Sequence, residues 1–202
     1  LHRACPKTRG DDLMCGVVGI LSTKKQIAGE LYESLIHLQH RGQDAAGIMT
    51  YNERFHVKKG TGLVRDVFDE QNMARLQGKI GIGHTRYPTV GGFSVEEAQP
   101  VLTSVPYGIA MAHNGNLVNY SELAREVSQE NHRPINSSVD IEVILHVFGH
   151  ALDHPAGNTA ELSFFDQICQ GVEAVFNRVS GAYSVVGIIM NRGMVVFRDP
   201  HG

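Results

Sequence analysis

The sequence is poor in the features that mark several large classes of protein. It has three cysteines among 202 residues, Cys5, Cys15 and Cys169, and no Cys-x-x-Cys pair. This odd number excludes a disulfide framework and a cysteine-rich structural zinc site. No apolar run is long enough to cross a bilayer, and residues 1–13 lack the pattern of a secretory signal. We therefore expect a cytoplasmic protein with no membrane partner.

Positive charge is not in excess either. Eighteen Lys and Arg residues oppose twenty-one Asp and Glu residues, which gives a net charge of -3. This balance argues against a nucleic-acid partner that binds through a broad basic face. Hydrophobic residues make up 42% of the chain and charged residues 19%, as in ordinary globular proteins. A chain of this length can form one domain with a well-developed core.

Apolar periodicity predicts strands towards both ends of the chain, with helices between them. The expected helices cover residues 28–39, 140–152 and 162–179. The expected strands cover residues 15–21, 46–50, 55–59, 79–85 and 107–113, followed by a hairpin of residues 182–190 and 194–198. Strands and helices do not alternate one by one. This order favours an α+β fold, with antiparallel sheets covered by helices, over a doubly wound parallel sheet.

Four polar, glycine-flanked segments near strand ends form the candidate site. They are CG at residues 15–16, HRGQD at 40–44, HTRYPT at 84–89 and HNGN at 113–116. If Met14 is removed, Cys15 carries a thiol and a free α-amine, whose ordinary pKa values are about 8.5 and about 8. One residue could then supply both a nucleophile and a base. Taken alone, Cys15 is better explained as a small core residue at the start of a buried strand.

Other polar residues also have both a chemical and an ordinary interpretation. Arg86, in a tight turn, suits bidentate capture of a carboxylate but could be a surface arginine. Asp140 is a candidate helix N-cap that could also be a rigid ligand. Asn114 and Gly115 form a turn signal. They could equally place an amide side chain beside a backbone N–H as an oxyanion hole.

Two alternative sites compete with this one. His146, His150 and His154 are spaced four residues apart and could bind a metal from one helix face. Their run lacks the Glu of the metalloprotease pattern, and Pro155 should end the helix before His154. A solvated histidine stripe is the simpler interpretation. A phosphate loop is disfavoured because the glycine-rich residues 78–83 lack a Gly-Lys-Ser/Thr ending.

In their extended forms, the four segments together resemble class II glutamine amidotransferases, a family of N-terminal-nucleophile hydrolases. The strings are MCGVVGI at residues 14–20, LQHRGQDAAG at 38–47, GHTRYPT at 83–89 and AHNGNL at 112–117. The resemblance continues to Gly202. Within the class, the forms QHRGQD and RYPT are typical of the branch that delivers ammonia to phosphoribosyl pyrophosphate at the start of purine synthesis.

The resemblance implies a fold and a catalytic centre. The fold would be a four-layer α/β/β/α sandwich, in line with the order of strands and helices. Cys15 would attack the side-chain amide of glutamine, with its own α-amine as the base. Asn114 and Gly115 would form the oxyanion hole.

The resemblance also implies how glutamine is held. Arg86 would bind the α-carboxylate and Asp140 the α-ammonium. Charges at the two ends of the amino acid would leave only the amide near the nucleophile. Thr89 would line the glutamine site, and Arg41 would support the surroundings of the nucleophile. The loop of residues 87–97 would close over the substrate.

Domains and partners follow from the same resemblance. Residues 1–14 are expected to be a leader, a propeptide or an upstream remnant, and residues 15–202 the glutaminase domain. A C-terminal phosphoribosyltransferase domain, with its Mg²⁺ site, would be the partner within a homo-oligomeric full-length enzyme. The glutaminase domain itself should hold no metal or cofactor. The alternatives are a catalytically inactive glutamine-binding or assembly domain and, in third place, a metal-dependent hydrolase that uses His146 and His150.

Overall fold

The computed structural model describes residues 15–87, 94–129, 133–157 and 162–201. The helices are α1 (Ala28–Leu38), α2 (Val64–Val67), α3 (Glu70–Met73), α4 (Tyr120–Gln129), α5 (Asp140–Asp153) and α6 (Phe164–Arg178). The strands are β1 (Gly16–Leu21), β2 (Ala45–Asn52), β3 (Arg54–Thr61), β4 (Ile80–Arg86), β5 (Val101–Thr103), β6 (Ile109–Leu117), β7 (Gly181–Ile189) and β8 (Gly193–Arg198).

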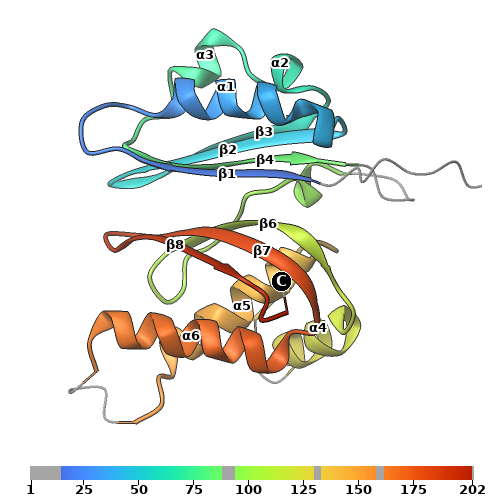
Figure 1. Ribbon diagram of the computed structural model, residues 1–202, viewed down its shortest axis with the longest axis vertical. Helices are drawn as coiled ribbons and strands as arrows, with labels where there is room; N and C mark the ends of the chain where they lie inside the picture. Colours follow the sequence, from blue (N-terminus) through green and yellow to red (C-terminus); the bar gives the residue numbers. More distant parts are fainter. Residues whose placement is uncertain (1–14, 88–93, 130–132, 158–161, 202) are drawn as a thin grey trace, which may run out of the picture.

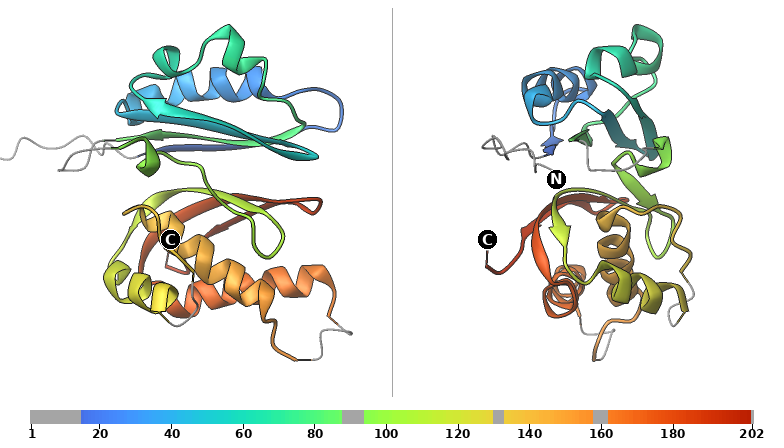
Figure 2. Two further views of the ribbon diagram at one scale, coloured as in Figure 1. Left: turned by 180° about the vertical axis from the view of Figure 1, so that it is seen from behind. Right: turned by 90° about the vertical axis from the view of Figure 1, so that its right-hand side faces the viewer.

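These elements stack in four layers (Figure 1). The first sheet has the strand order β1-β4-β2-β3 and the second β5-β6-β7-β8, with antiparallel pairing throughout. Helices α1, α2 and α3 cover the outer face of the first sheet, and α4, α5 and α6 cover that of the second (Figure 1). Figure 2 shows the same stacking from behind and from the side. The expected four-layer α/β/β/α sandwich is therefore confirmed.

Apolar side chains fill the three spaces between the layers. Leu31 and Leu35 of α1 pack on the first sheet, and Phe148 of α5 packs on the second. Between the two sheets lies a core of small and medium residues: Met49, Ile82, Ala110, Ala112, Val186 and Ile188. Because both faces of each sheet are covered, the central strand β2 is buried at six successive positions. Such strands are continuous apolar runs in the sequence rather than alternating ones.

The structure corrects some of the expected elements. The strand expected at residues 107–113 runs instead over Ile109–Leu117, and β5 and helices α2, α3 and α4 were not anticipated. Phe165, an apolar residue of the helix expected over residues 162–179, has a side chain that is 71% exposed. The apolar face of α6 instead follows Phe164, Ile168 and Val172, which pack against the core at a spacing of four residues, and Phe165 lies off this face.

Gly47 allows a close approach between β2 and the segment that leads into β5. A Cβ atom at Gly47 would lie 2.0 Å from the backbone oxygen of Gln99, which cannot move aside as a flexible side chain can. We expect Gly47→Ala to lower the free energy of unfolding by about 1–3 kcal/mol, the usual cost of overpacking. Urea unfolding followed by circular dichroism measures this change.

Gly29 is the matched control for this substitution. It is the second residue of α1, it is exposed, and a Cβ atom there would meet nothing within 4 Å. Gly29→Ala should therefore stabilise the protein by up to about 1 kcal/mol through helix propensity. Equal stability of the Gly47→Ala variant and the parent protein would contradict the packing seen at β2.

Candidate active site

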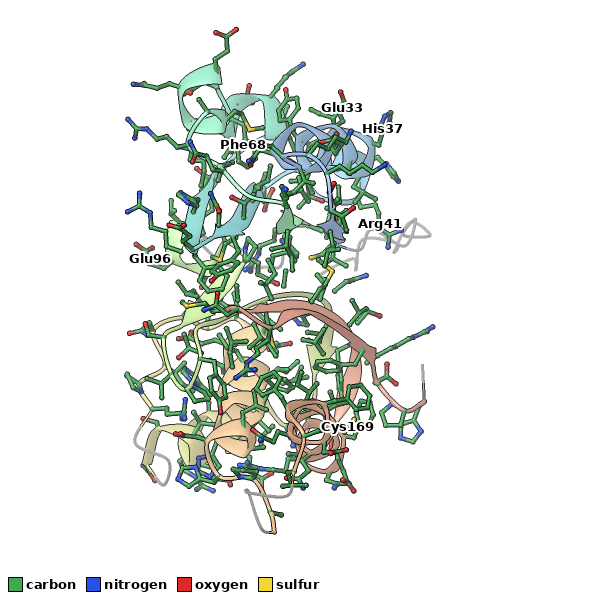
Figure 3. The ribbon with its side chains drawn as sticks, turned by 90° about the vertical axis from the view of Figure 1, so that its left-hand side faces the viewer. Glu33, His37, Arg41, Phe68, Glu96 and Cys169 are labelled. Atoms are coloured by element: carbon green, nitrogen blue, oxygen red, sulfur yellow. The ribbon has the colours of Figure 1, made fainter. Side chains whose placement is uncertain are left out.

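Three of the four sequence segments singled out above meet at one end of the first sheet. Antiparallel pairing places the start of β1 beside the end of β4, with Gly16 opposite Thr85, and the start of β2 beside the last residue of β4, Arg86. Cys15 immediately precedes β1. Arg41 donates from Nε to the carbonyl oxygen of Cys15 over 3.4 Å. Arg41 lies at the edge of the sandwich, whereas Cys169 lies in the outer helical layer (Figure 3).

The second sheet contributes the opposite wall of a cavity of about 420 Å³. In its register, Asn114 of β6 pairs with Ser184 of β7, and Ser184 pairs with Arg198 of β8. The residues that line the cavity are Cys15, Tyr87, Asn114, Gly115, Asn116, Ala182, Tyr183, Ser184, Arg198 and Asp199. The structure thus brings Cys15, Asn114 and Gly115 to one cavity, although they come from different sheets and are about a hundred residues apart in the sequence.

The backbone N–H of Gly115 points away from β7. The N–H of His113 donates to Gln99 Oε1 over 2.7 Å, and that of Leu117 donates to Asp140 Oδ2 over 2.8 Å. Both N–H groups therefore point away from β7. Every second N–H along a strand points to the same side, so that of Gly115 points there too. The N–H of Gly115 therefore lies between the N–H groups of His113 and Leu117, which are hydrogen-bonded to the side chains of Gln99 and Asp140.

Gly115 is also the residue that the packing of β6 against β7 requires. A Cβ atom at this position would lie 2.2 Å from the carbonyl oxygen of Ala182 and 2.6 Å from the Cα atom of Tyr183. Since both neighbours are backbone atoms of the paired strand, a side chain here would force the strands apart. Glycine therefore keeps the strand pairing intact beside the cavity.

Arg86 and Asp140 lie outside the set of residues that line this cavity. Arg86 donates from Nη1 to the carbonyl oxygen of Glu97 over 3.3 Å, and its Nη2 lies 3.8 Å from Glu97 Oε2. Burial raises the pKa of the Asp140 carboxyl, and the Leu117 N–H and the charge of Arg86 oppose this shift. Arg86 and Asp140 are thus close enough to interact electrostatically.

The expectation that Asp140 caps α5 is wrong. The N-cap residue is Val139, and Asp140 is the first residue inside the helix. Its carboxylate does not turn back to its own helix, because it accepts the hydrogen bond from Leu117 on β6. Asp140 therefore connects the start of α5 to the end of β6. Thr89 and part of the 87–97 loop fall outside the described residues.

The histidine stripe on α5 is not uniformly solvated, contrary to expectation. His146 is buried, with Nε2 4.0 Å from Glu142 Oε1, whereas His154 is exposed and its ring stacks on that of His150. The helix ends at Asp153, before His154, as Pro155 led us to expect. Among the described residues, no group of three or more His, Cys, Asp or Glu side chains is placed to hold a metal ion.

A buried histidine pair, which sequence reasoning did not identify, joins the two sheets. His84 on β4 donates from Nε2 to the carbonyl oxygen of His113 on β6 over 3.1 Å. Burial lowers the pKa of His84 to about 3, helped by His113 and Arg86. Burial also lowers the pKa of His113 to about 4, with a further contribution from the charge of Arg86. Both rings are therefore neutral near pH 7.

This pair predicts acid sensitivity. Between pH 6.5 and about 4, an unfolded histidine takes up a proton that the folded His84 or His113 does not, so the free energy of unfolding should fall as the pH decreases. Urea unfolding at successive pH values measures the slope. A His113→Gln variant should show a shallower slope. The exposed His37 of α1 is the control, since His37→Gln should keep the slope of the parent protein.

Comparison with known proteins identifies the family of this chain. A family model described as a glutamine amidotransferase domain matches residues 89–202. Amidophosphoribosyltransferase of Pseudomonas aeruginosa is 47% identical over 189 residues, which cover 93% of this chain and 37% of that protein. The Escherichia coli amidophosphoribosyltransferase is 46% identical over 191 residues, 94% of this chain and 37% of that protein. The chain thus spans little more than a third of the length of these curated relatives.

A solved structure gives the same result. The glutamine phosphoribosylpyrophosphate amidotransferase of B. subtilis, complexed with ADP and GMP, superposes with a TM-score of 0.73 at 32% identity. The match covers 92% of this chain and 37% of that one. Within the described ranges, no helix is both long and apolar enough to cross a membrane. With more than half of its length matched by the family model, the chain belongs to the glutamine amidotransferase domain family.

Proposed function

We propose that this chain hydrolyses the side-chain amide of glutamine, with Cys15 as the nucleophile, and supplies the ammonia to phosphoribosyl pyrophosphate. Family membership supports the first half-reaction, and the relatives' name supports the acceptor. One observation carries the proposal: Cys15, Asn114 and Gly115 line a single cavity. A nucleophile and two candidate oxyanion donors therefore face the same space.

Cys15 would act as the first residue of the mature chain. Its α-amine takes the thiol proton, and the sulfur attacks the amide carbon of glutamine. Collapse of the tetrahedral intermediate breaks the carbon–nitrogen bond and releases ammonia, with the proton returned by the amine. Water then hydrolyses the thioester to glutamate. Arg41, which donates to the Cys15 carbonyl, holds the backbone of the nucleophile in place.

The oxyanion of the tetrahedral intermediate would be bound by the Asn114 side chain and the Gly115 N–H. The direction of that N–H, away from β7 and between two satisfied neighbours, supports this role. Since both groups belong to a strand at the centre of a sheet, they are held in position before the reaction begins. Preorganised donors of this kind stabilise developing charge without reorganisation.

The charged ends of glutamine would be bound by Arg86 and Asp140. Arg86 offers a fork of N–H donors for the α-carboxylate. Asp140 accepts the Leu117 N–H with Oδ2, and its carboxylate would also bind the α-ammonium. We assign Thr89 a place beside the substrate by analogy with the family. Opposite charges at the two ends fix the orientation of the amino acid, so that its amide faces Cys15.

The second half-reaction needs a further domain. The matched region covers only 37% of the curated relatives, and we propose that a phosphoribosyltransferase domain, with its Mg²⁺ site, follows the glutaminase domain in a homo-oligomeric enzyme. Residues 1–14 would be a leader, a propeptide or an upstream remnant that is absent from the active form. The free thiols of Cys15 and Cys169 fit a cytoplasmic location.

The proposal is tested with a chain whose first residue is Cys15. Mass spectrometry verifies the terminus, and the release of glutamate and ammonia from glutamine is then measured. A glutamine-like chloroketone should add one label, on Cys15, and leave Cys169 on α6 unmodified. Glutamine binding without any turnover or labelling would show instead an inactive binding domain.

A further inference from the structure

A short linking segment, residues 96–99, is held by two cations from the first sheet. Lys59 of β3 donates from Nζ to the carbonyl oxygens of Ala98, over 2.7 Å, and Glu96, over 3.4 Å. Arg86 of β4 donates from Nη1 to the carbonyl between them, that of Glu97, over 3.3 Å. Three successive carbonyl groups are thus occupied by side chains of the first sheet, which fixes the path of this backbone.

The other side of the linking segment contacts the second sheet and its helices. Gln99 Oε1 accepts the backbone N–H of His113 on β6. Ser138 donates from Oγ to Glu97 Oε1 over 2.5 Å. Ser138 lies two residues before Asp140, at the start of α5. The linking segment therefore connects the strand that carries Arg86 with the helix start that carries Asp140.

The side chain of Glu97 makes this connection. Its Oε1 accepts from Ser138, and its Oε2 lies 3.8 Å from Arg86 Nη2. The side chains of Glu97 and Arg86 are only 18% and 16% exposed. The Arg86–Glu97 pair is therefore shielded from solvent more than a surface ion pair is, and Ser138 holds Glu97 from the exposed side.

We propose that Glu97 is a positioning residue, which orients the Arg86 guanidinium relative to Asp140 so that both charged ends of one glutamine are held together. This inference rests on the proposed function, since it gives the same binding site a further residue. Glu97 acts through Arg86 and Ser138 and does not touch the substrate. A site held in this way loses affinity when its support is removed, even though the binding groups remain.

The neighbouring Glu96 provides a matched control. It is the same residue type one position earlier, but its side chain is exposed, and it contributes only its carbonyl to the contacts described above. In Figure 3 it lies at the opposite edge of the sandwich from Arg41. Glu96→Gln removes the same charge from the same segment, so a general electrostatic effect would appear in both variants.

Steady-state glutamine hydrolysis by the chain that begins at Cys15 gives the first test. Glu97→Gln should raise KM for glutamine roughly tenfold and leave kcat within about twofold, the pattern of lost substrate binding. Ser138→Ala should raise KM in the same direction. The double variant should resemble Glu97→Gln alone, because both substitutions break one connection. Glu96→Gln should keep the parent KM.

Three kinetic results would overturn the proposal. An unchanged KM in Glu97→Gln would show that Arg86 needs no support. A lowered KM would show that the Glu97 carboxylate competes with the substrate for Arg86. A raised KM in Glu97→Gln combined with an unaffected Ser138→Ala variant would indicate that Glu97 contacts glutamine directly.

A measurement without glutamine separates this inference from the proposed function. The guanidinium ¹⁵N signal of Arg86, assigned by its loss in Arg86→Lys, should shift and show greater mobility in Glu97→Gln but not in Glu96→Gln. If no chain hydrolyses glutamine, the proposed function fails while this signal still reports on Glu97. An Arg86 signal that is the same in both variants and the parent overturns the positioning role.

Discussion

A chain that begins at Cys15 and carries Cys15→Ala should lose glutaminase activity by at least about 10⁴-fold, as other enzymes do when their nucleophile is removed. Cys15 is the described cysteine that lines the cavity with Asn114 and Gly115. Without its sulfur no thioester can form. The measurement is glutamate release, with glutamine binding by calorimetry to show that the site remains intact.

The free amine should matter as much as the sulfur. A chain with one extra glycine before Cys15 keeps the thiol but turns the α-amine into an amide, which is not a base. We expect its activity to fall towards that of Cys15→Ala. The control is Cys169→Ala on α6, which should retain full activity because its thiol is exposed in the outer helical layer. Undiminished turnover by the glycine-extended chain would refute the role of the amine.

The second large effect is expected for Asn114→Ala. Removing one oxyanion donor costs about 10²–10³ in kcat, because the lost hydrogen bond is strongest in the transition state. KM for glutamine should change little, since Arg86 and Asp140 would still bind the charged ends. Steady-state kinetics separates the two parameters, and the melting temperature shows whether the variant is folded.

Asn116→Ala is the position-matched comparison for this effect. Asn116 lies two residues further along β6, is exposed, and also lines the cavity, but we assign it no role in binding the oxyanion. The kcat of Asn116→Ala should therefore fall far less than that of Asn114→Ala. If the two alanine variants lost activity equally, the oxyanion hole would have to be sought elsewhere in the cavity.

The long elements of the fold could be predicted from the sequence because their apolar periodicity is strong. Helix α5 is buried along most of its length, and the β7–β8 hairpin has an evident turn. Strand β5 was missed because three residues carry no periodic signal, and its pairing with β6 depends on partners elsewhere in the chain. The exposure of Phe165 shows the same limit at a helix end, where spacing alone does not fix the first buried residue.

Of the residues predicted for the site, Cys15, Asn114 and Gly115 line one cavity, whereas Arg86 and Asp140 lie outside its lining, and the roles of all five stay predictions. The strings around Cys15, Arg86 and Asn114 pointed to family roles. Nothing in them showed that Arg86 contacts Glu97, or that Asp140 accepts from Leu117 rather than capping its helix. Such contacts join segments that only the pairing of the sheets brings together. The sequence therefore indicated which chemical groups to consider, and the structure showed the contacts that hold Arg86 and Asp140 in place.

In this four-layer fold, the packing between the two sheets sets the distance between the catalytic groups. Cys15 directly precedes β1 of the first sheet, and Asn114 lies on β6 of the second. The thickness of the apolar layer between the sheets therefore sets the distance between the Cys15 sulfur and the Asn114 side chain. Ala110 and Ala112, the small residues of that filling, allow the two sheets to come close. A larger side chain at either position would push the two sheets apart. It would increase the distance between Cys15 and Asn114 without replacing any polar group of the site.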